Sequence, residues 1–229
     1  IDRIEAAVMA SSLIHADDTP IQVQDHALRK KGLGKGSRKG RIWTYVCDQR
    51  PWAGTTPPAV VYRYAPNWRQ EHVREHLKEA GCILQADAYK GYEQLYKAKA
   101  GEKPRFREAG CWAHWRRDFH DIWKSNRSAI ARQALEYIGE LYDIERKIAG
   151  KPASVRLAER QKRSKSRLDK FKAWADEQLK TLPPKSSLAA AFRYGLTRWP
   201  AFTLFIEDGR VAIDNNPAER ALRPIGIGR

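Results

Sequence analysis

The alternation of apolar and polar residues along the chain predicts an α/β fold. Three runs near the start are rich in β-branched and aromatic residues and are bounded by turn residues, which is typical of strands. They cover residues 12–23, 41–49 and 59–66. The first run is expected to be interrupted at residues 17–20, where two aspartates precede Thr19 and Pro20. We therefore expect the chain to open with three meandering strands.

The following part of the chain alternates between helical and extended patterns. Residues 67–81 are amphipathic, with Val73 and Leu77 four residues apart, which predicts a helix. Short strands are expected at residues 82–87 and from residue 106 onward, each leading into a helix. Three strands followed by such strand–helix pairs predict a mixed sheet covered by helices.

Residues from about 127 to 200 have a different character. Apolar positions recur there at helical spacing, with many Lys and Arg residues between them, and prolines at 183, 184 and 200 separate the segments. We expect this part to be an all-helical insertion inside the α/β domain.

The charge of the chain points to a polyanionic partner. Its 229 residues include 43 Lys and Arg against 27 Asp and Glu, a formal net charge of +16, which attracts nucleic acids by long-range attraction and counterion release. A glycine-rich segment, residues 26–41, has no acidic residue and is expected to be a flexible loop or hairpin tip that follows a DNA backbone. Its basic residues are Arg29, Lys30, Lys31, Lys35, Arg38, Lys39 and Arg41.

Cysteine usage and hydropathy favour a cytoplasmic protein. Cys47, Cys82 and Cys111 are far apart and form no C-x-x-C pair, which fits a reducing compartment and gives no zinc or disulfide pattern. No apolar run approaches the roughly 20 residues that a membrane span needs, so no membrane partner is expected. The chain starts without Met, on what reads as the end of a helix, and we expect it to be a piece of a longer protein.

Two aspartates end apolar strand segments. Asp17 follows residues 13–16, and Asp87 follows residues 82–86. Carboxylates at the ends of neighbouring strands can converge on one divalent cation, and such oxygen ligands suit Mg²⁺. Each aspartate also has a simpler interpretation, since Asp17 or Asp18 can form a turn before Thr19, and Asp87 can cap the next helix.

A glutamate late in the chain admits two interpretations as well. In the segment NPAE, Asn216 would be the N-cap of a helix and Glu219 its third residue, which is a capping-box pattern. Alternatively, Glu219 faces the two aspartates and completes a metal site. Arg220 and Arg223 would then contact DNA phosphates or balance the charge of the site.

Four segments in this order, HADDTP, LQADAYKGY, CWAHWRRDF and DNNPAERALRPIGIGR, resemble the insertion-sequence-sixty-six family of bacterial transposases. The resemblance implies a ribonuclease-H-like mixed sheet flanked by helices, with a catalytic Asp-Asp-Glu triad at Asp17, Asp87 and Glu219. It also implies a helical insertion before the last catalytic helix. The expected division is residues 10–126 for the first part of the core, 127–200 for the insertion and 201–229 for the end of the core. Where the family commonly reads HADET, this chain has Asp18, which leaves open whether Asp17 or Asp18 faces the metal.

The activity implied by the resemblance is that of a DNA transposase. Metal-dependent cleavage frees a 3′-hydroxyl, which attacks target DNA, with two Mg²⁺ or Mn²⁺ ions held by the triad. Its partners would be the DNA of the transposon ends and of the target, and a homodimer would form in the DNA complex. It would be located in the bacterial cytoplasm, associated with the nucleoid. His114, Arg116 and Arg117 are weaker candidates for DNA contact. The alternatives are an inactive DNA-binding remnant or another ribonuclease-H-like nuclease; the +16 charge argues against a glycosidase.

Overall fold

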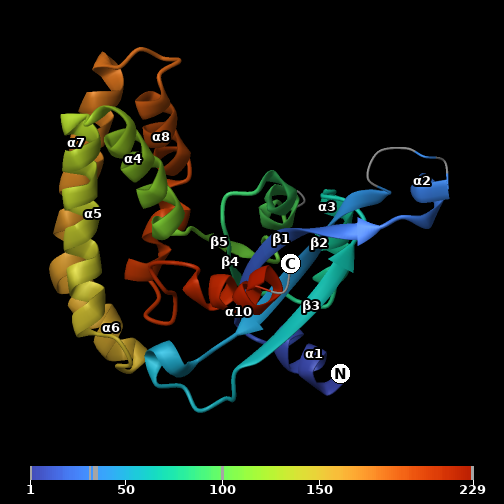
Figure 1. Ribbon diagram of the computed structural model, residues 1–229. Coiled ribbons are helices and arrows are strands. Elements are labelled where there is room, and N and C mark those ends of the chain that lie inside the picture. Colours follow the sequence, from blue (N-terminus) through green and yellow to red (C-terminus); the bar gives the residue numbers. More distant parts are fainter. Residues whose placement is uncertain (1, 31, 33–35, 99–100, 228–229) are drawn as a thin grey trace. The chain divides into compact units, whose positions relative to one another are not determined.

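The computed structural model describes residues 2–30, 32, 36–98 and 101–227, which fold into two compact units (Figure 1). The sheet unit comprises Ile1–Asp48, Pro58–Arg107 and Asn216–Arg229. The helical unit comprises Gln49–Pro57 and Glu108–Asn215. These boundaries follow packing. The predicted division into a core of residues 10–126 and 201–229 with an insertion of residues 127–200 stays a prediction.

A five-stranded mixed sheet forms the centre of the sheet unit. Its order is β3-β2-β1-β4-β5, and its strands are β1 (Leu13–Gln24), β2 (Ser37–Cys47), β3 (Ala59–Ala65), β4 (Ile83–Gln85) and β5 (Arg107–Ala109). The first three strands are antiparallel neighbours, and β4 runs parallel to β1. The mixed α/β architecture predicted from the sequence is therefore confirmed.

The first strand is continuous, so the predicted interruption at residues 17–20 is wrong. β1 pairs with β2 from His15 to Gln24, and Pro20 lies opposite Arg41. β4 pairs only with Leu13–His15, so beyond His15 the strand has one open edge. A strand with an open edge accommodates proline, because the missing N–H removes no ladder hydrogen bond on that side.

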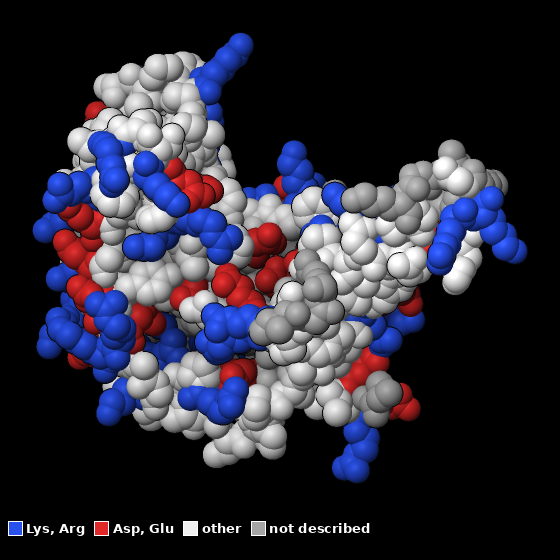
Figure 2. Space-filling model, in the orientation of Figure 1, with Lys and Arg blue, Asp and Glu red and all other residues white. Residues whose placement is uncertain are grey.

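The basic segment 26–41 is more ordered than a flexible loop. It begins with the short helix α2 (His26–Lys30), and Ser37–Arg41 already belong to β2. Lys31 and Lys35 lie outside the described residues. Lys and Arg side chains gather at this end of the β1–β2 hairpin, over α2 (Figure 2).

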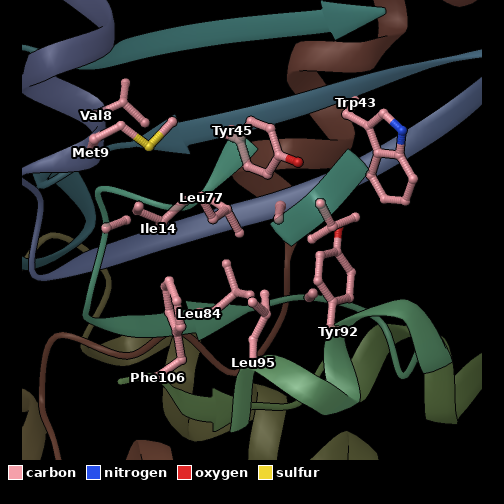
Figure 3. Packing of buried hydrophobic residues seen from close by; sticks show 14 of the residues in the cluster. Val8, Met9, Ile14, Trp43, Tyr45, Leu77, Leu84, Tyr92, Leu95 and Phe106 are labelled. Carbon is pink, nitrogen blue, oxygen red and sulfur yellow. The ribbon is translucent and has the colours of Figure 1, made fainter. Parts of the chain in front are cut away.

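One face of the sheet carries the hydrophobic core of the sheet unit (Figure 3). Ile14, Ala16, Trp43 and Tyr45 alternate along β1 and β2 and are fully buried because every second residue of a strand points to the same face. They pack with residues of α1 (Asp2–Met9), α3 (Gln70–His76) and the 3-10 helix η2 (Lys90–Tyr96). Helix α3 is shorter than the predicted helix over 67–81. The opposite face receives the last helix, α10 (Asn216–Ile227), which packs on β1 and β2.

The helical unit is built around aromatic side chains. Trp112, Trp115, Phe171 and Phe202 contact one another, with ring centroids 4.8–5.8 Å apart. Its elements are η1 (Arg50–Trp52), α4 (Trp112–Asn126), α5 (Ala129–Lys147), α6 (Ala153–Glu159), the π-helical turn η3 (Arg160–Ser164), α7 (Lys165–Thr181), α8 (Ser187–Leu196), α9 (Trp199–Thr203) and η4 (Leu204–Ile206). The change from strand to helix near Cys111 and the serine cap of α8 are as predicted: the Ser186 hydroxyl accepts from the Ala189 N–H at 3.2 Å.

A buried arginine joins three segments of the helical unit. The guanidinium of Arg160 lies in the π-helical turn and donates to both carboxylate oxygens of Glu145, at 2.7 and 2.6 Å. It also donates to the carbonyl of Phe205 at 2.9 Å.

None of the described helices combines the length and the apolar character that crossing a membrane requires.

Candidate active site

Asp17 and Asp87 are brought together by the pairing of two parallel strands. Leu13 pairs with Ile83, and His15 pairs with Gln85. Asp87 follows the end of β4 by two residues, and its charge acts on the Asp17 carboxyl. Asp17 itself is two residues past His15 in β1 and therefore lies on the same face as His15, the face that α10 covers.

The environment of Asp17 is unfavourable for a lone negative charge. The pKa of its carboxyl is raised from 3.8 to about 7, chiefly by burial and also by the charges of Asp87, Asp18 and Glu219, while a hydrogen bond from the Asp18 N–H at 2.8 Å lowers it. Like charges near one another disfavour ionisation. Three carboxylates from three separate elements thus act on one another at this point of the sheet.

Helix α10 positions Glu219 by burying its apolar side. Ala218 and Leu222 are buried, while Glu219 is half-buried with its Oε1 atom shielded from solvent. Residues in a helix are about 100° apart around the axis, which places Glu219 and Ala221 on opposite flanks. The helix begins at Asn216, one residue earlier than a capping box with Asn216 as N-cap requires.

Asp18 points to the other face of the sheet, as the alternation of β1 requires. Its carboxylate forms an ion pair with Arg41 and accepts a hydrogen bond from the Trp68 indole N–H at 3.2 Å. The Arg41 guanidinium in turn lies 4.3 Å from the centre of the Trp68 ring. Of the two adjacent aspartates, Asp17 is the one on the face of Glu219.

Asp87 also makes the local contact that the simpler interpretation expects. Its Oδ1 accepts from the Tyr89 N–H at 3.3 Å, and Tyr89 is the residue that precedes η2. This turn fixes the carboxylate just past the end of β4. The contact is compatible with a second role, because a carboxylate has several acceptor positions.

Among the predicted DNA contacts of the sheet unit, four lie exposed at the hairpin end. These are Arg29, Lys30, Arg38 and Lys39. Arg38 lies 3.4 Å from a carboxylate oxygen of Asp25. Arg41 is engaged by Asp18 and Trp68, as described above. Arg220 and Arg223 are exposed on α10.

The remaining predicted contacts belong to the helical unit. His114 is half-buried, with its Nδ1 3.2 Å from the Cys111 Sγ. Arg116 and Arg117 are exposed on α4. His114 therefore contacts a packed cysteine within its own unit, and the two arginines present free surface charge.

Several polar and aromatic residues around the site escaped the sequence interpretation. His15, Thr44 and Gln85 are fully buried. His15 and Gln85 pair with each other, and each lies two residues before an aspartate, Asp17 or Asp87. Tyr62 donates a hydrogen bond to the Ala221 carbonyl of α10 at 2.6 Å. The alternation Val60, Tyr62, Tyr64 within β3 was the signal that these side chains share a face.

One of the comparisons with known proteins identifies a family. The family described as "Transposase IS66 family" matches residues 1–229. Two relatives from Sinorhizobium fredii (strain NBRC 101917 / NGR234), the uncharacterized proteins y4hP and y4qI, are 42% and 37% identical to it over 100% of this chain. In both cases the chain spans 42% of the relative's length. No solved structure matches. On the strength of the match along its whole length, the chain belongs to the IS66 family of transposases.

Proposed function

We propose that this chain is the catalytic part of a DNA transposase with a ribonuclease-H-like core. The observation that supports the proposal is that the charges of Asp87, which follows β4, and of Glu219, on α10, both act on the Asp17 carboxyl of β1. Residues 127–200 are then an insertion between the second and third carboxylates. Two copies would act together, one at each end of the element.

The donor set fits a divalent metal ion. Three carboxylates on one face of the sheet supply hard oxygen ligands of the kind that Mg²⁺ and Mn²⁺ prefer. Burial, together with the charges of the neighbouring carboxylates, raises the pKa of Asp17, and a cation among the carboxylates would offset both effects. Asp17, Asp87 and Glu219 would hold the metal, with Asp17 as the shared ligand.

Bound metal would supply Lewis-acid activation of the attacking oxygen and stabilisation of the leaving oxygen. The protein's own contribution is positioning. β1 and β4 fix two carboxylates through the ladder, and α10 holds the third. In the proposed reaction water attacks phosphorus and the bond to the 3′ oxygen breaks, which leaves a 5′-phosphate and a free 3′-hydroxyl. This 3′-hydroxyl then attacks a target phosphodiester, whose own bond to its 3′ oxygen breaks as the new bond forms, and that oxygen leaves as a 3′-hydroxyl of the target. Arg220 and Arg223, exposed on α10, are suited to hold the phosphates on either side.

The test replaces one carboxylate without changing its shape. We expect Asp87→Asn to abolish Mn²⁺-dependent nicking of supercoiled plasmid and to weaken Mn²⁺ binding in calorimetry at least tenfold. Its DNA affinity without metal should stay within twofold of the unaltered chain. Glu79→Gln, at an exposed carboxylate of the same unit, serves as the matched control and should change none of the three.

Crystals soaked in Mn²⁺ would locate the ion directly. An anomalous peak shared by Asp17 and Asp87, with Glu219 within reach, would support the proposal. Full nicking by Asp87→Asn, or a peak bound elsewhere, would overturn the assignment. DNA binding without any metal binding would instead identify an inactive remnant.

A further inference from the structure

A row of large exposed side chains runs along β3, on the same face of the sheet as the carboxylates. Val60, Tyr62 and Tyr64 are 36%, 41% and 47% exposed, while Val61 and Arg63 between them are half-buried on the core side. The rings therefore stand on the face that carries α10. Exposed aromatic residues gathered on one strand are unusual on a chain of such high charge, because isolated surface positions are normally polar.

The register of the sheet relates this row to the active site. Tyr62 pairs with Thr44, which pairs with Asp17. Neighbouring strands are about 4.8 Å apart, so Tyr62 stands about 10 Å from Asp17 across the sheet. Helix α10 lies between them: Glu219 is on its flank toward Asp17, and the Ala221 carbonyl accepts the Tyr62 hydroxyl on the other flank.

Tyr64 has the freer ring of the two tyrosines. Its ring lies over Gly40 of β2, where a Cβ atom would come within 2.7 Å of the Tyr64 Cε2. The missing side chain at Gly40 therefore lets the ring lie against the backbone of the sheet. One side of the ring is supported in this way, and the rest of the side chain is open to solvent.

Positive charge lies on the path between the two groups. Arg220 and Arg223 are exposed on α10, and the chain as a whole carries +16. A nucleic-acid strand with a phosphate at the carboxylates can cross these arginines and bring a base to β3 within two or three nucleotides, since a nucleotide spans several ångströms. Single strands bind through such a combination of basic grooves and aromatic rings.

We propose that Tyr64, supported by Tyr62, stacks on an unpaired nucleobase of the DNA strand whose phosphate lies at the carboxylate site. The inference rests on the proposed function for the position of the strand. It adds a separate binding site for a flipped or frayed base on β3, with the hydroxyl of Tyr62 fixing α10 beside it.

The test uses the 229-residue chain in EDTA, so that no chemistry takes place. The probe is a fluorescently labelled duplex with a single-stranded extension, and binding is followed by anisotropy. We expect Tyr64→Leu to weaken binding about tenfold, since stacking on one base is worth about 1–3 kcal/mol, while binding to the blunt duplex changes less than twofold. Tyr64→Phe keeps the ring and should bind the extension like the unaltered chain.

A double-mutant cycle shows whether the ring meets a base. Abasic sites are placed singly at each position of the extension. At one position, two to three nucleotides from the junction, the abasic change should weaken binding of the unaltered chain but not of Tyr64→Leu. Equal losses in both proteins at every position would overturn the proposal, as would equal losses of Tyr64→Leu on blunt and extended duplexes.

The outcome is independent of catalysis. If Asp87→Asn retained nicking, the carboxylate assignment would fail while the cycle could still succeed. If nicking depended on Asp87 and the cycle failed, only the stacking site would be lost. Sedimentation of Tyr64→Leu covers the remaining case: a change in oligomeric state without a change in DNA affinity would make β3 a contact between copies and overturn the stacking site.

Discussion

At the scale of single residues, neighbouring aspartates in one strand have opposite roles. Asp17 and Asp18 are identical in chemistry, yet β1 directs the first toward Glu219 and the second toward Arg41 and Trp68. Sequence alone left the choice between them open, because only the position of the core decides which face is which. Once Trp43 and Tyr45 are known to be buried, the alternation of the strand assigns both aspartates.

The raised pKa of Asp17 predicts a pH-dependent stability. A carboxyl whose pKa rises from 3.8 when unfolded to about 7 when folded contributes stability that is complete below pH 4 and is lost as pH rises through 7. Above that pH the cost of ionising it is on the order of 4 kcal/mol. In EDTA, Asp17→Asn should therefore melt at a higher temperature than the unaltered chain at pH 8, and at nearly the same temperature at pH 4.5.

Thermal melting at several pH values checks this prediction, and the control is Asp25→Asn, at an aspartate of the hairpin end. An advantage of Asp17→Asn that stayed constant from pH 4.5 to 8 would contradict it. Addition of Mn²⁺ at pH 8 should raise the melting temperature of the unaltered chain more than that of the variant, because a ligand that binds only the folded state stabilises it.

At the scale of elements, the sequence predicted the structure correctly where a local pattern decides it. It failed where packing between distant segments decides it. The passage from β5 to α4 near Cys111 follows from residue type and helical spacing. The continuity of β1 through Pro20 does not, because it depends on β4 pairing with only three residues of β1. The contact of Tyr62 with α10 joins residues far apart in sequence, and no local pattern reports it.

The π-helical turn of the helical unit contains a buried arginine with several partners. Arg160 is fully buried and holds both oxygens of Glu145. We expect Arg160→Lys to destabilise the helical unit by about 3 kcal/mol, because an ammonium cannot reach both oxygens of Glu145 and the carbonyl of Phe205, and a buried acceptor left without a donor costs about 1–3 kcal/mol.

Urea denaturation followed by tryptophan fluorescence measures this loss, and Arg132→Lys, in an exposed pair with Glu136, is the matched control. The control should shift the unfolding midpoint little, since exposed pairs contribute about 0–1 kcal/mol. Equal shifts for the two variants would show that Arg160 is not a central support.

At the scale of the whole molecule, the net charge predicts how DNA binding responds to salt. Each phosphate that the protein neutralises contributes about −0.9 to the slope of log affinity against log salt concentration. We expect the combined change of Arg29, Lys30 and Lys39 to alanine to make that slope less negative by about 2 to 3, because these exposed residues lie on α2 and at the start of β2.

Anisotropy titrations at several salt concentrations test the hairpin contact. Lys165, Lys170 and Lys180, exposed on α7, give a triple alanine control that removes the same charge. If both triple variants changed the slope equally, general charge and not the hairpin would account for binding.

The place of α10 in the fold has a consequence for synthesis. The sheet unit takes its last helix from residues 216–227, after the whole of the segment Glu108–Asn215 has been made. Any nonsense or frameshift mutation within that segment therefore removes Glu219 and leaves Asp17 and Asp87 behind. Until α10 has been made and has docked, a nascent chain carries a sheet with only two of the three proposed metal ligands, and we expect it to be unable to cut DNA.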